Sequence, residues 1–337
     1  MTRRSDVLSA RLADPAPLSV GDADALVEAL ADVEVEEGTR RRWLVGLSAR
    51  PVEAEELAAL GAAMRARAMP VAAPPGAVDS AGTGGDASHS VNLSTAAALV
   101  VAACGVPVVK HGNRAVSGRC GSADVLEALG VVLATSAQQA EAQLDRAGFT
   151  FLFAPTFHAA TRAIGPLRRS LGVPTAFNLL GPLTNPARPE VQLVGAASPD
   201  AASALAGALR RLGVRGATVH GDNGWDEASP CAPWTQWGTD GTRVRDTALR
   251  WGIDACDAAD LAGGDPADNA DALRRVFAGD GAERSRGLFD AVRLQAALIL
   301  TLRGHERAHA VACATEALTS GAVRSVLERL SERPPER

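Results

Sequence analysis

The stretch that decides the fold runs from Asp79 to Val131 and reads DSAGTGGDASHSVNLSTAAALVVAACGVPVVKHGNRAVSGRCGSADVLEALGV. Clusters of glycine, hydroxyl and basic residues stand at both ends of a purely apolar segment, AAALVVAACGVPVV. The apolar segment predicts a buried helix followed by a buried strand. The clusters predict loops rich in backbone N–H groups, which suit an anionic ligand such as a phosphate.

Beyond this stretch, short apolar or β-branched runs such as FTFLF, EVQLVGAA and GATVHG alternate with helical segments rich in Ala, Leu and Arg. Such alternation predicts an α/β domain with a central, mostly parallel sheet. Two short runs around a Gly-Thr-Asp-Gly turn in CAPWTQWGTDGTRVRD predict a hairpin. The first seventy residues predict short amphipathic helices, and PVAAPPGAV at 70–78 predicts a connector. We therefore expect a small helical domain followed by a larger α/β domain.

Composition limits the classes of function. The 337 residues are 47% hydrophobic and 22% charged, with a formal net charge of −5, as in ordinary globular proteins. This acidic balance argues against a general nucleic-acid binder, which carries a basic stripe. Five cysteines without a CxxC pair predict reduced thiols. No apolar run of about 18 residues occurs, and the first residues carry no apolar signal core, so we expect a cytoplasmic protein without a membrane partner.

Two loops predict a phosphate site. The glycines of GTGGD, Gly82, Gly84 and Gly85, can bend the backbone and present N–H groups to an anion, although a plain turn at the end of a strand also fits this motif. The spacing matches neither a P-loop nor a dinucleotide-binding fingerprint. In SVNLST, Ser94 or Thr95 begins the apolar helix, where free N–H groups and the helix dipole attract phosphate. Simple helix capping explains these hydroxyls as well.

KHGNRAVSG follows the buried run VPVV, at the carboxyl end of a strand, where α/β proteins bind ligands. Lys110 and Arg114 supply positive charge, while His111 and Asn113 supply oriented polar atoms. We interpret this loop as part of a binding site.

Two further motifs carry possible metal ligands. Asp226 and Glu227 are adjacent carboxylates that suit Mg²⁺ bridged to substrate phosphates, although acidic pairs on loops are commonly just solvated. His305 and His309 in HERAH match the bare HExxH pattern of zinc proteases. No third ligand is apparent downstream in the sequence, so a solvated helix face is the better interpretation.

The ordered motifs GTGGD, VNLST, KHGNRAVSG, GSADVLEALG, FLFAPTFH, FNLLGPLTNPA, GWDEAS and GGDPADNA resemble those of the anthranilate phosphoribosyltransferase family, over nearly the whole chain. The resemblance implies a helical domain at residues 1–73, with an inserted helical piece at about 158–180. It implies an α/β domain of the nucleoside phosphorylase/phosphoribosyltransferase type at 77–157 and 181–330, and a frayed tail at 331–337. It also implies a homodimer formed through the helical domain.

The activity implied by the resemblance is transfer of the 5-phosphoribosyl group from phosphoribosyl pyrophosphate (PRPP) to the amino group of anthranilate, in tryptophan biosynthesis. The products would be N-(5-phosphoribosyl)anthranilate and pyrophosphate, with Mg²⁺ as cofactor and no covalent catalytic residue. By motif, the PRPP-binding residues would be Gly82, Thr83, Gly85, Asp86, Asn92, Ser94, Thr95, Lys110 and Ser122. The anthranilate-binding residues would be Gly82, His111, Asn113, His158, Arg168 and Pro182. The Mg²⁺ ligands would be Ser94, Asp226 and Glu227.

The sequence departs from the family pattern at Pro174, where Arg is common, and at Thr161, Gln295 and Ala87, where Met, Asn and Gly are common. A paralogue that uses a substituted aromatic acceptor is therefore one alternative. A pyrimidine nucleoside phosphorylase, which has a related architecture, is a second, although KHGNR and GPLTNP argue against it. A non-catalytic relative that binds nucleotides or nucleic acid is a third, and the net acidity and the retained acidic pair weigh against it.

Overall fold

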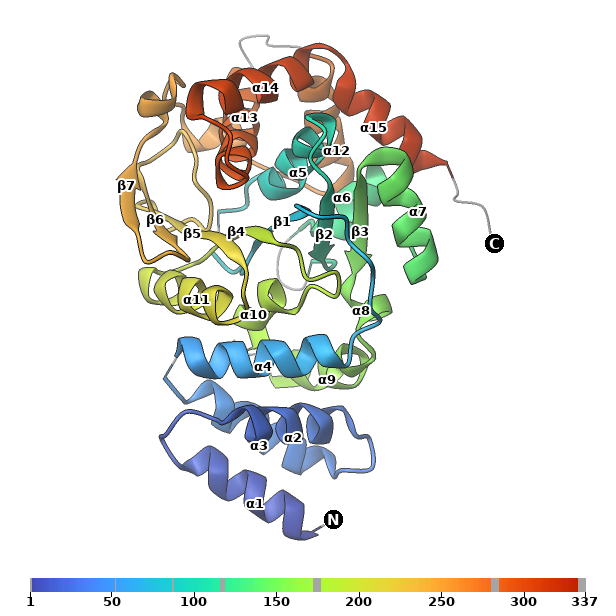
Figure 1. Cartoon of the computed structure of the whole chain (residues 1–337), viewed down its shortest axis with the longest axis vertical. Coiled ribbons are helices and arrows are strands. Elements are labelled where there is room, and N and C mark those ends of the chain that lie inside the picture. The colour runs from blue at the N-terminus through green and yellow to red at the C-terminus, as the bar shows by residue number, and fades with distance from the viewer. Residues whose placement is uncertain are drawn as a thin grey trace.

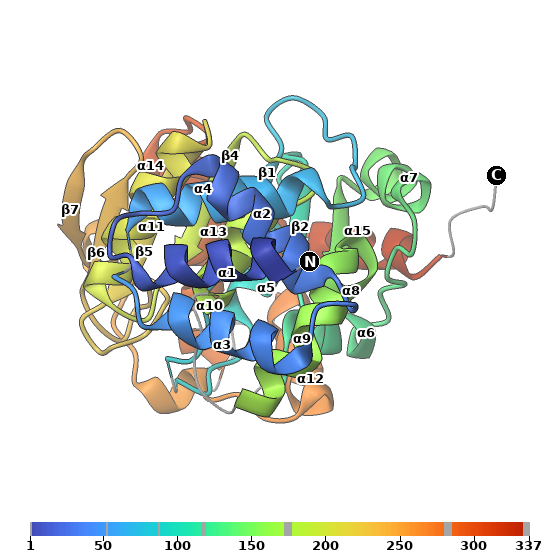
Figure 2. The ribbon, with the colours of Figure 1, turned by 90° about the horizontal axis from the view of Figure 1, so that it is seen from below.

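The computed structural model describes residues 2–51, 53–86, 88–115, 119–171, 177–279 and 285–332. Its N-terminal end is a layer of helices (Figure 1, and Figure 2 from below). This layer contains α1 (Thr2–Ala13), α2 (Val20–Ala31), α3 (Glu37–Ser48), α4 (Ala54–Ala66) and α9 (Ala159–Leu171). Helix α9 packs against α2 and α3, so a segment from the middle of the chain returns to this layer. The domain boundaries stay a prediction, and residues 333–337 of the predicted tail lie outside the described ranges.

Capping side chains define where helices of this layer begin, and apolar contacts hold the layer against the rest of the chain. At the start of α2, the Ser19 hydroxyl accepts the Asp22 N–H and the Asp22 carboxylate accepts the Ser19 N–H, both at 3.1 Å. This reciprocal cap satisfies two backbone donors. Leu26 and Trp43 are buried in a core that continues through α4 into α11 (Pro199–Arg211). The packing of α4 on α11 therefore joins the helical layer to the α/β body.

In the described part of the chain, one sheet of seven strands runs in the order β3-β2-β1-β4-β5-β6-β7. The strands are β1 (Val78–Gly82), β2 (Val108–Gly112), β3 (Phe149–Phe153), β4 (Val191–Gly195), β5 (Arg215–Gly221), β6 (Trp234–Gly238) and β7 (Arg243–Asp246). Strands β1 to β5 are parallel, whereas β6 and β7 are added antiparallel. The mostly parallel sheet and the β6–β7 hairpin confirm the predictions made from the sequence.

Strand order places a ligand site beside β1. From β1 the chain proceeds outward to β2 and β3, then crosses back to β4 on the other side of β1. In such a sheet, ligands bind at the carboxyl ends of the strands where the order reverses. The register aligns Val78 with both Val108 and Val191, and Gly82 with Gly195. The loops that follow β1, β2 and β4 therefore emerge at the same edge.

The remaining helices cover the two faces of the sheet (Figure 1). They are α5 (Leu93–Ala103), α6 (Ser122–Ala128), α7 (Ala137–Ala147), α8 (Ala154–Phe157), α10 (Phe177–Leu180), α12 (Pro266–Phe277), α13 (Arg286–Leu302), α14 (Arg307–Thr319) and α15 (Ala322–Ser331), with short 3₁₀ turns η1 (Gly181–Thr184), η2 (Ala248–Trp251) and η3 (Ala258–Leu261). Helix α5 is enclosed by β1, α13, α14 and α15, which explains why it is apolar all round. Helix α11 lies on the opposite face. No helix of the described ranges is both long and apolar enough to span a bilayer.

We expect Leu99→Ala to destabilise the protein by about 2–5 kcal/mol, because Leu99 is fully buried in the middle of α5 and its truncation leaves a cavity. The matched control is Leu249→Ala, since the Leu249 side chain is 68% exposed. Urea denaturation, monitored by circular dichroism, measures the free energy of unfolding of both variants. Equal loss of stability in the two variants would show that α5 is not the core helix.

Candidate active site

Two segments from distant parts of the sequence meet at the carboxyl edge of the sheet. The Asp226 N–H donates to Asp86 Oδ2 at 3.2 Å, and the Gly84 N–H donates to Asp226 Oδ2 at 2.8 Å. The Ser90 hydroxyl donates to Glu227 Oε2 at 3.2 Å. The loop after β5 therefore lies directly on the loop after β1. These contacts gather the carboxylates of Asp86, Asp226 and Glu227 into one group, called here the acidic cluster.

Electrostatics within the acidic cluster favour a cation. Burial raises the pKa of Asp226 to about 7, and the nearby charge of Asp86 adds to this rise. Burial, with the negative charges of Asp226 and Asp86, also raises the pKa of Glu227 well above its usual value. Glu227 further accepts a backbone hydrogen bond from Ser94, so the structure brings the three predicted metal ligands together. Carboxylate and hydroxyl oxygens are the ligands that Mg²⁺ prefers, so these residues fit that ion.

Two loops border the acidic cluster. Gly84 and Gly85 adopt φ values of 66° and 77°, a left-handed conformation that favours glycine. Asn92 caps the N-terminal end of α5, so Ser94 and Thr95 lie in the first turn of that helix, as predicted. This first turn carries the positive end of the helix dipole. Its N–H groups are engaged, because those of Leu93 and Thr95 donate to backbone carbonyl oxygens and that of Ser94 donates to Glu227. A left-handed glycine turn and the positive end of a helix dipole, two features that attract anions, thus lie beside the acidic cluster.

Lys110 supplies the buried positive charge of the site. Its side chain is 2% exposed, and its ammonium donates to the Ser80 carbonyl oxygen and, at 3.4 Å, to the Ser94 hydroxyl. Burial lowers the pKa of Lys110 to about 8, against the opposing attraction of Asp79 and Glu227. Lys110 therefore stays mainly protonated at pH 7, next to the first turn of α5.

Arg114, the other cation of the same sequence motif, has a different role. Its guanidinium pairs with Asp124 Oδ1 at 2.9 Å and with both carboxylate oxygens of Glu127 on the protein surface. The expectation that Arg114 adds free positive charge to the site is therefore wrong, because two acids on α6 neutralise it.

The other predicted PRPP residues line the same edge or support it. The Thr83 hydroxyl accepts the Ala197 N–H at 3.3 Å, between the ends of β1 and β4. The Asn92 amide donates to the Cys120 carbonyl oxygen at 3.2 Å, and the Ser122 hydroxyl donates to the Asn113 carbonyl oxygen at 3.2 Å. These contacts hold the loop after β2 against the start of α5. Thr95 is fully buried, and its hydroxyl has no partner among the described residues.

Among the predicted acceptor residues, His111 and His158 pack together with ring centroids 5.1 Å apart and an angle of 59° between the rings. Burial lowers the pKa of His111 to about 3 and that of His158 to about 4, so both are neutral at pH 7. Each makes a backbone hydrogen bond with η1, His111 with Gly181 and His158 with Thr184. Pro182 lies in this turn and is buried. The structure therefore brings His111, His158 and Pro182 together.

Arg168 and Asn113 complete the predicted acceptor set. Arg168 lies on α9, donates to Asn178 Oδ1 at 3.0 Å, and has its guanidinium carbon 5.7 Å from the centre of the Phe177 ring. Its side chain is half-buried, and burial lowers its pKa. Asn113 is exposed at the start of the loop after β2. Their contact with an acceptor stays a prediction.

Two supporting residues escaped the sequence analysis. Asp79 is fully buried on β1, where its carboxylate accepts the Asn185 amide at 2.9 Å, the Gln192 amide at 3.2 Å and the His111 N–H at 3.3 Å. Burial raises its pKa. Gly195 ends β4, and a Cβ atom there would overlap the Asp226 carbonyl oxygen. Asp79 could have been predicted from the sequence, because it is an acid in an otherwise buried strand. Nothing in the sequence distinguishes Gly195.

Among the four departures from the family pattern, Pro174 and Ala87 lie outside the described residues, as does the side chain of Thr161. Gln295 is buried in α13.

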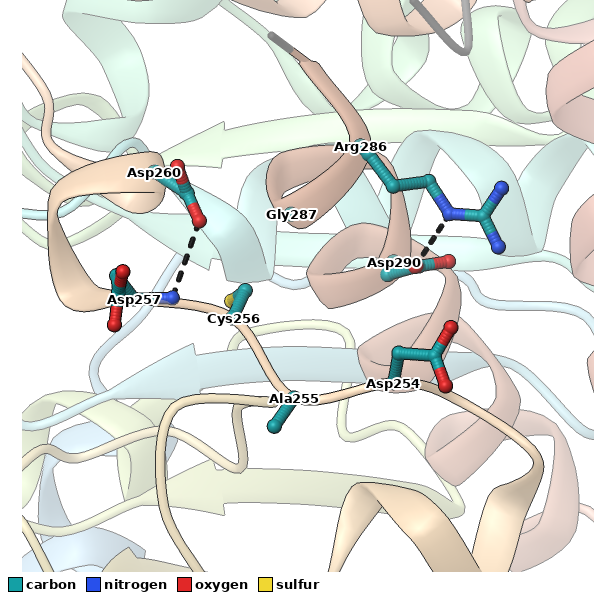
Figure 3. A pocket seen from close by; sticks show the side chains of 8 residues that line it. All are labelled: Asp254, Ala255, Cys256, Asp257, Asp260, Arg286, Gly287 and Asp290. Carbon is teal, nitrogen blue, oxygen red and sulfur yellow. Dashed lines mark hydrogen bonds and ion pairs between the residues drawn. The ribbon is translucent and has the colours of Figure 1, made fainter. Parts of the chain in front are cut away.

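A pocket of about 330 Å³ between η3 and the start of α13 shares no residue with this site (Figure 3). Its acids are engaged with neighbouring groups. Asp260 accepts the Asp257 N–H at 3.1 Å, and Asp290 pairs with Arg286 at 2.8 Å. Cys256 contacts another thiol nearby, and all five cysteines are free, as predicted.

Comparison with known proteins identifies the family. The model of the family described as "Glycosyl transferase family, a/b domain" matches residues 74–324. The chain is 43% identical over 323 residues to an anthranilate phosphoribosyltransferase of Parasynechococcus marenigrum, a match that covers 94% of this chain and 91% of that protein. The chain belongs to the anthranilate phosphoribosyltransferase family.

Solved structures of anthranilate phosphoribosyltransferases have the same fold. The crystal structure from Thermus thermophilus is 39% identical, with a TM-score of 0.90, and the match covers 96% of this chain and 98% of that one. The Saccharomyces cerevisiae enzyme in complex with PRPP and Mg is 25% identical, with a TM-score of 0.89 and coverage of 97% and 96%. The same yeast enzyme in complex with 4-fluoroanthranilate gives a TM-score of 0.85 and covers 97% of each chain. These matches confirm the predicted family, fold class and enzyme class.

The buried histidine pair predicts acid sensitivity. The pKa of a histidine in an unfolded chain is about 6.5, so below this pH the unfolded state takes up protons that the folded state excludes. The free energy of unfolding contributed by His111 and His158 is therefore fully present above about pH 6.5 and falls as the pH drops towards about 4. The double variant His111→Gln/His158→Gln should lose less stability on acidification than the wild type.

Melting temperatures of both proteins, measured between about pH 7.5 and about pH 4.5, check this difference. Other groups titrate in both proteins alike, so the difference isolates the pair. Parallel curves for the two proteins would contradict a neutral, buried pair.

Proposed function

We propose that the protein transfers the 5-phosphoribosyl group from PRPP to the amino group of anthranilate and releases pyrophosphate, as a step of tryptophan biosynthesis. The observation that carries this proposal is the acidic cluster, which lies beside the Gly84–Gly85 turn, the first turn of α5 and Lys110 at the carboxyl edge of β1 and β2. The yeast relative in complex with PRPP and Mg, which shares the fold, supports it. The relatives named above all carry this activity in their names, which argues against a nucleoside phosphorylase or a non-catalytic binding protein.

On the donor side, Asp226, Glu227 and Ser94 would hold Mg²⁺, with PRPP phosphates completing its oxygen ligands. When bound, Mg²⁺ supplies positive charge that stabilises the departing pyrophosphate. The Gly84–Gly85 turn and the positive end of the α5 dipole would attract the phosphate oxygens. Lys110 adds a protonated ammonium in a buried place, where its charge acts more strongly than in water. These fixed groups are already oriented before the C1–oxygen bond breaks, so little reorganisation is needed.

On the acceptor side, the aromatic amine of anthranilate is neutral at pH 7 and already nucleophilic. The neutral imidazoles of His111 and His158 would line its path together with Pro182. Arg168 would pair with the acceptor carboxylate through two parallel hydrogen bonds, which fixes the direction of the amine. Holding the amine in line with C1 converts a bimolecular reaction into an oriented one, worth several kcal/mol. No residue forms a covalent intermediate in this scheme.

The proposal includes the domain organisation, the homodimer and the cytoplasmic location predicted from the sequence. The helical layer offers apolar surface for a dimer, because four of its valines are exposed. These are Val7, Val20, Val33 and Val45.

The activity is tested by mixing the protein with anthranilate, PRPP and Mg²⁺ and following anthranilate fluorescence, which should decline. We expect Arg168→Ala to raise the KM for anthranilate about tenfold or more, the cost of one lost charge-assisted pair, and to change the KM for PRPP little. Arg162→Ala is the matched control, because Arg162 is exposed on the same helix. Constant fluorescence with folded protein would refute the activity. Equal damage to both KM values would refute the role of Arg168.

Substituted anthranilates in the same assay separate the two acceptor alternatives. If a substituted anthranilate gives a higher kcat/KM than anthranilate itself, the protein is a paralogue with a different acceptor.

The metal assignment is tested with the double variant Asp226→Asn/Glu227→Gln, which keeps the side-chain shapes and removes two charges. We expect this variant to need at least tenfold more Mg²⁺ for half-maximal rate, because a hard cation loses its anionic ligands. Asp222→Asn, an exposed acid on the same loop, is the control and should respond to Mg²⁺ like the wild type. An unchanged Mg²⁺ response in the double variant would exclude this metal site.

A further inference from the structure

Three side chains with metal-binding atoms gather at the turn between α13 and α14. His305 lies in the turn, and His309 and Cys313 follow at intervals of four residues on α14. Residues four apart on a helix are neighbours on one face. The ligating atoms of His305, His309 and Cys313 all lie within 4.8 Å of one another. The two imidazole rings are nearly parallel, with centroids 5.5 Å apart, and the Cys313 sulfur lies 3.4 Å from His309 Nε2.

The tertiary structure changes the meaning of the HERAH motif. In a zinc protease the glutamate of this pattern is a general base. Here the Glu306 carboxylate accepts the His309 N–H at 3.1 Å and caps the N-terminal end of α14. The motif is therefore not that of a protease. The third ligand that the linear pattern lacked is Cys313, one turn further along the helix.

We propose that His305, His309 and Cys313 bind one divalent transition-metal ion of the zinc class. Two imidazole nitrogens and a thiolate suit Zn²⁺ and related ions such as Co²⁺, and do not suit Mg²⁺. In tetrahedral coordination the ligating atoms lie roughly 3.5 Å apart, so rotation of these side chains is sufficient to close the site. His309 is exposed and the other two are half-buried, so an ion enters from solvent. The fourth position is left for water.

The ion would act as a structural clamp. An adjacent face of α14 is held by Ala310 and Ala314, which are fully buried, and the helix packs against α13 and α5. Bound metal would tie the turn after α13 to the first two turns of α14. The site shares no residue with the acidic cluster, so Mg²⁺ and a zinc-class ion would occupy separate places. An ion that binds only the folded state stabilises that state.

Titration of the chelator-treated full-length protein with Co²⁺, in excess Mg²⁺, tests the proposal. Tetrahedral Co²⁺ bound to a thiolate gives visible d–d bands and a near-ultraviolet charge-transfer band. We expect both bands to saturate at one Co²⁺ per chain and to disappear on addition of Zn²⁺. Cys313→Ser should abolish the charge-transfer band. His305→Ala and His309→Ala should each weaken Co²⁺ binding at least tenfold.

Cys104→Ser is the matched control, because Cys104 is a half-buried thiol near Cys313; burial raises the pKa of Cys104 and Cys313 adds to this rise. This variant should keep the bands. Zn²⁺ should raise the melting temperature of the wild type and of Cys104→Ser, but not that of Cys313→Ser. The proposal is overturned if the wild type shows no charge-transfer band, or if Cys313→Ser keeps it. Loss of the band in Cys104→Ser alone would equally overturn the ligand set.

Discussion

The site depends on one close approach between backbones. The segment that carries Asp226 lies against the ends of β1 and β4, and a side chain at Gly82 or Gly195 would overlap it. Because both positions are glycine, Asp226 can accept the Gly84 N–H and donate its own N–H to Asp86. This contact brings the loop after β5 against the loop after β1 and so assembles the acidic cluster.

Burial of charge gives the site its chemical character. Asp226, Glu227 and Lys110 are ionisable groups that burial pushes towards their neutral forms, so the pKa of each acid rises and that of the lysine falls. A cation next to the two acids, or an anion next to the lysine, offsets the cost of burying their charges. The site is therefore complementary to a metal ion and an anionic sugar. A magnesium-bound diphosphate brings both charges at once. The histidine pair is neutral for the same reason, because burial lowers the pKa of both imidazoles.

Most of the site was predictable because its chemistry is local. A glycine turn, hydroxyls at a helix start and a lysine at a strand end each need only a few adjacent residues, and the structure places Gly85, Ser94 and Lys110 as expected. The errors and omissions concern long-range partners. From the sequence, Arg114 was expected to supply positive charge to the loop, but in the structure it pairs with two acids on α6. Gly195 could not be recognised before its neighbour was known.

The sequence by itself determined the alternation of strands and helices, the hairpin and the family. Hydrophobic periodicity, turn residues and ordered motifs each involve residues close together in the chain, so they can be recognised without the tertiary structure. Only the tertiary structure decided which side chains meet. Asp86 and Asp226 are 140 residues apart, and their contact exists because the strand order places β4 beside β1 and β5 beside β4. The same holds for Asp79, which links β1, β2 and β4 through its carboxylate. The spacing of residues along the chain determines the local backbone geometry. The partner of a buried charge is determined only by the order of the strands in the assembled sheet.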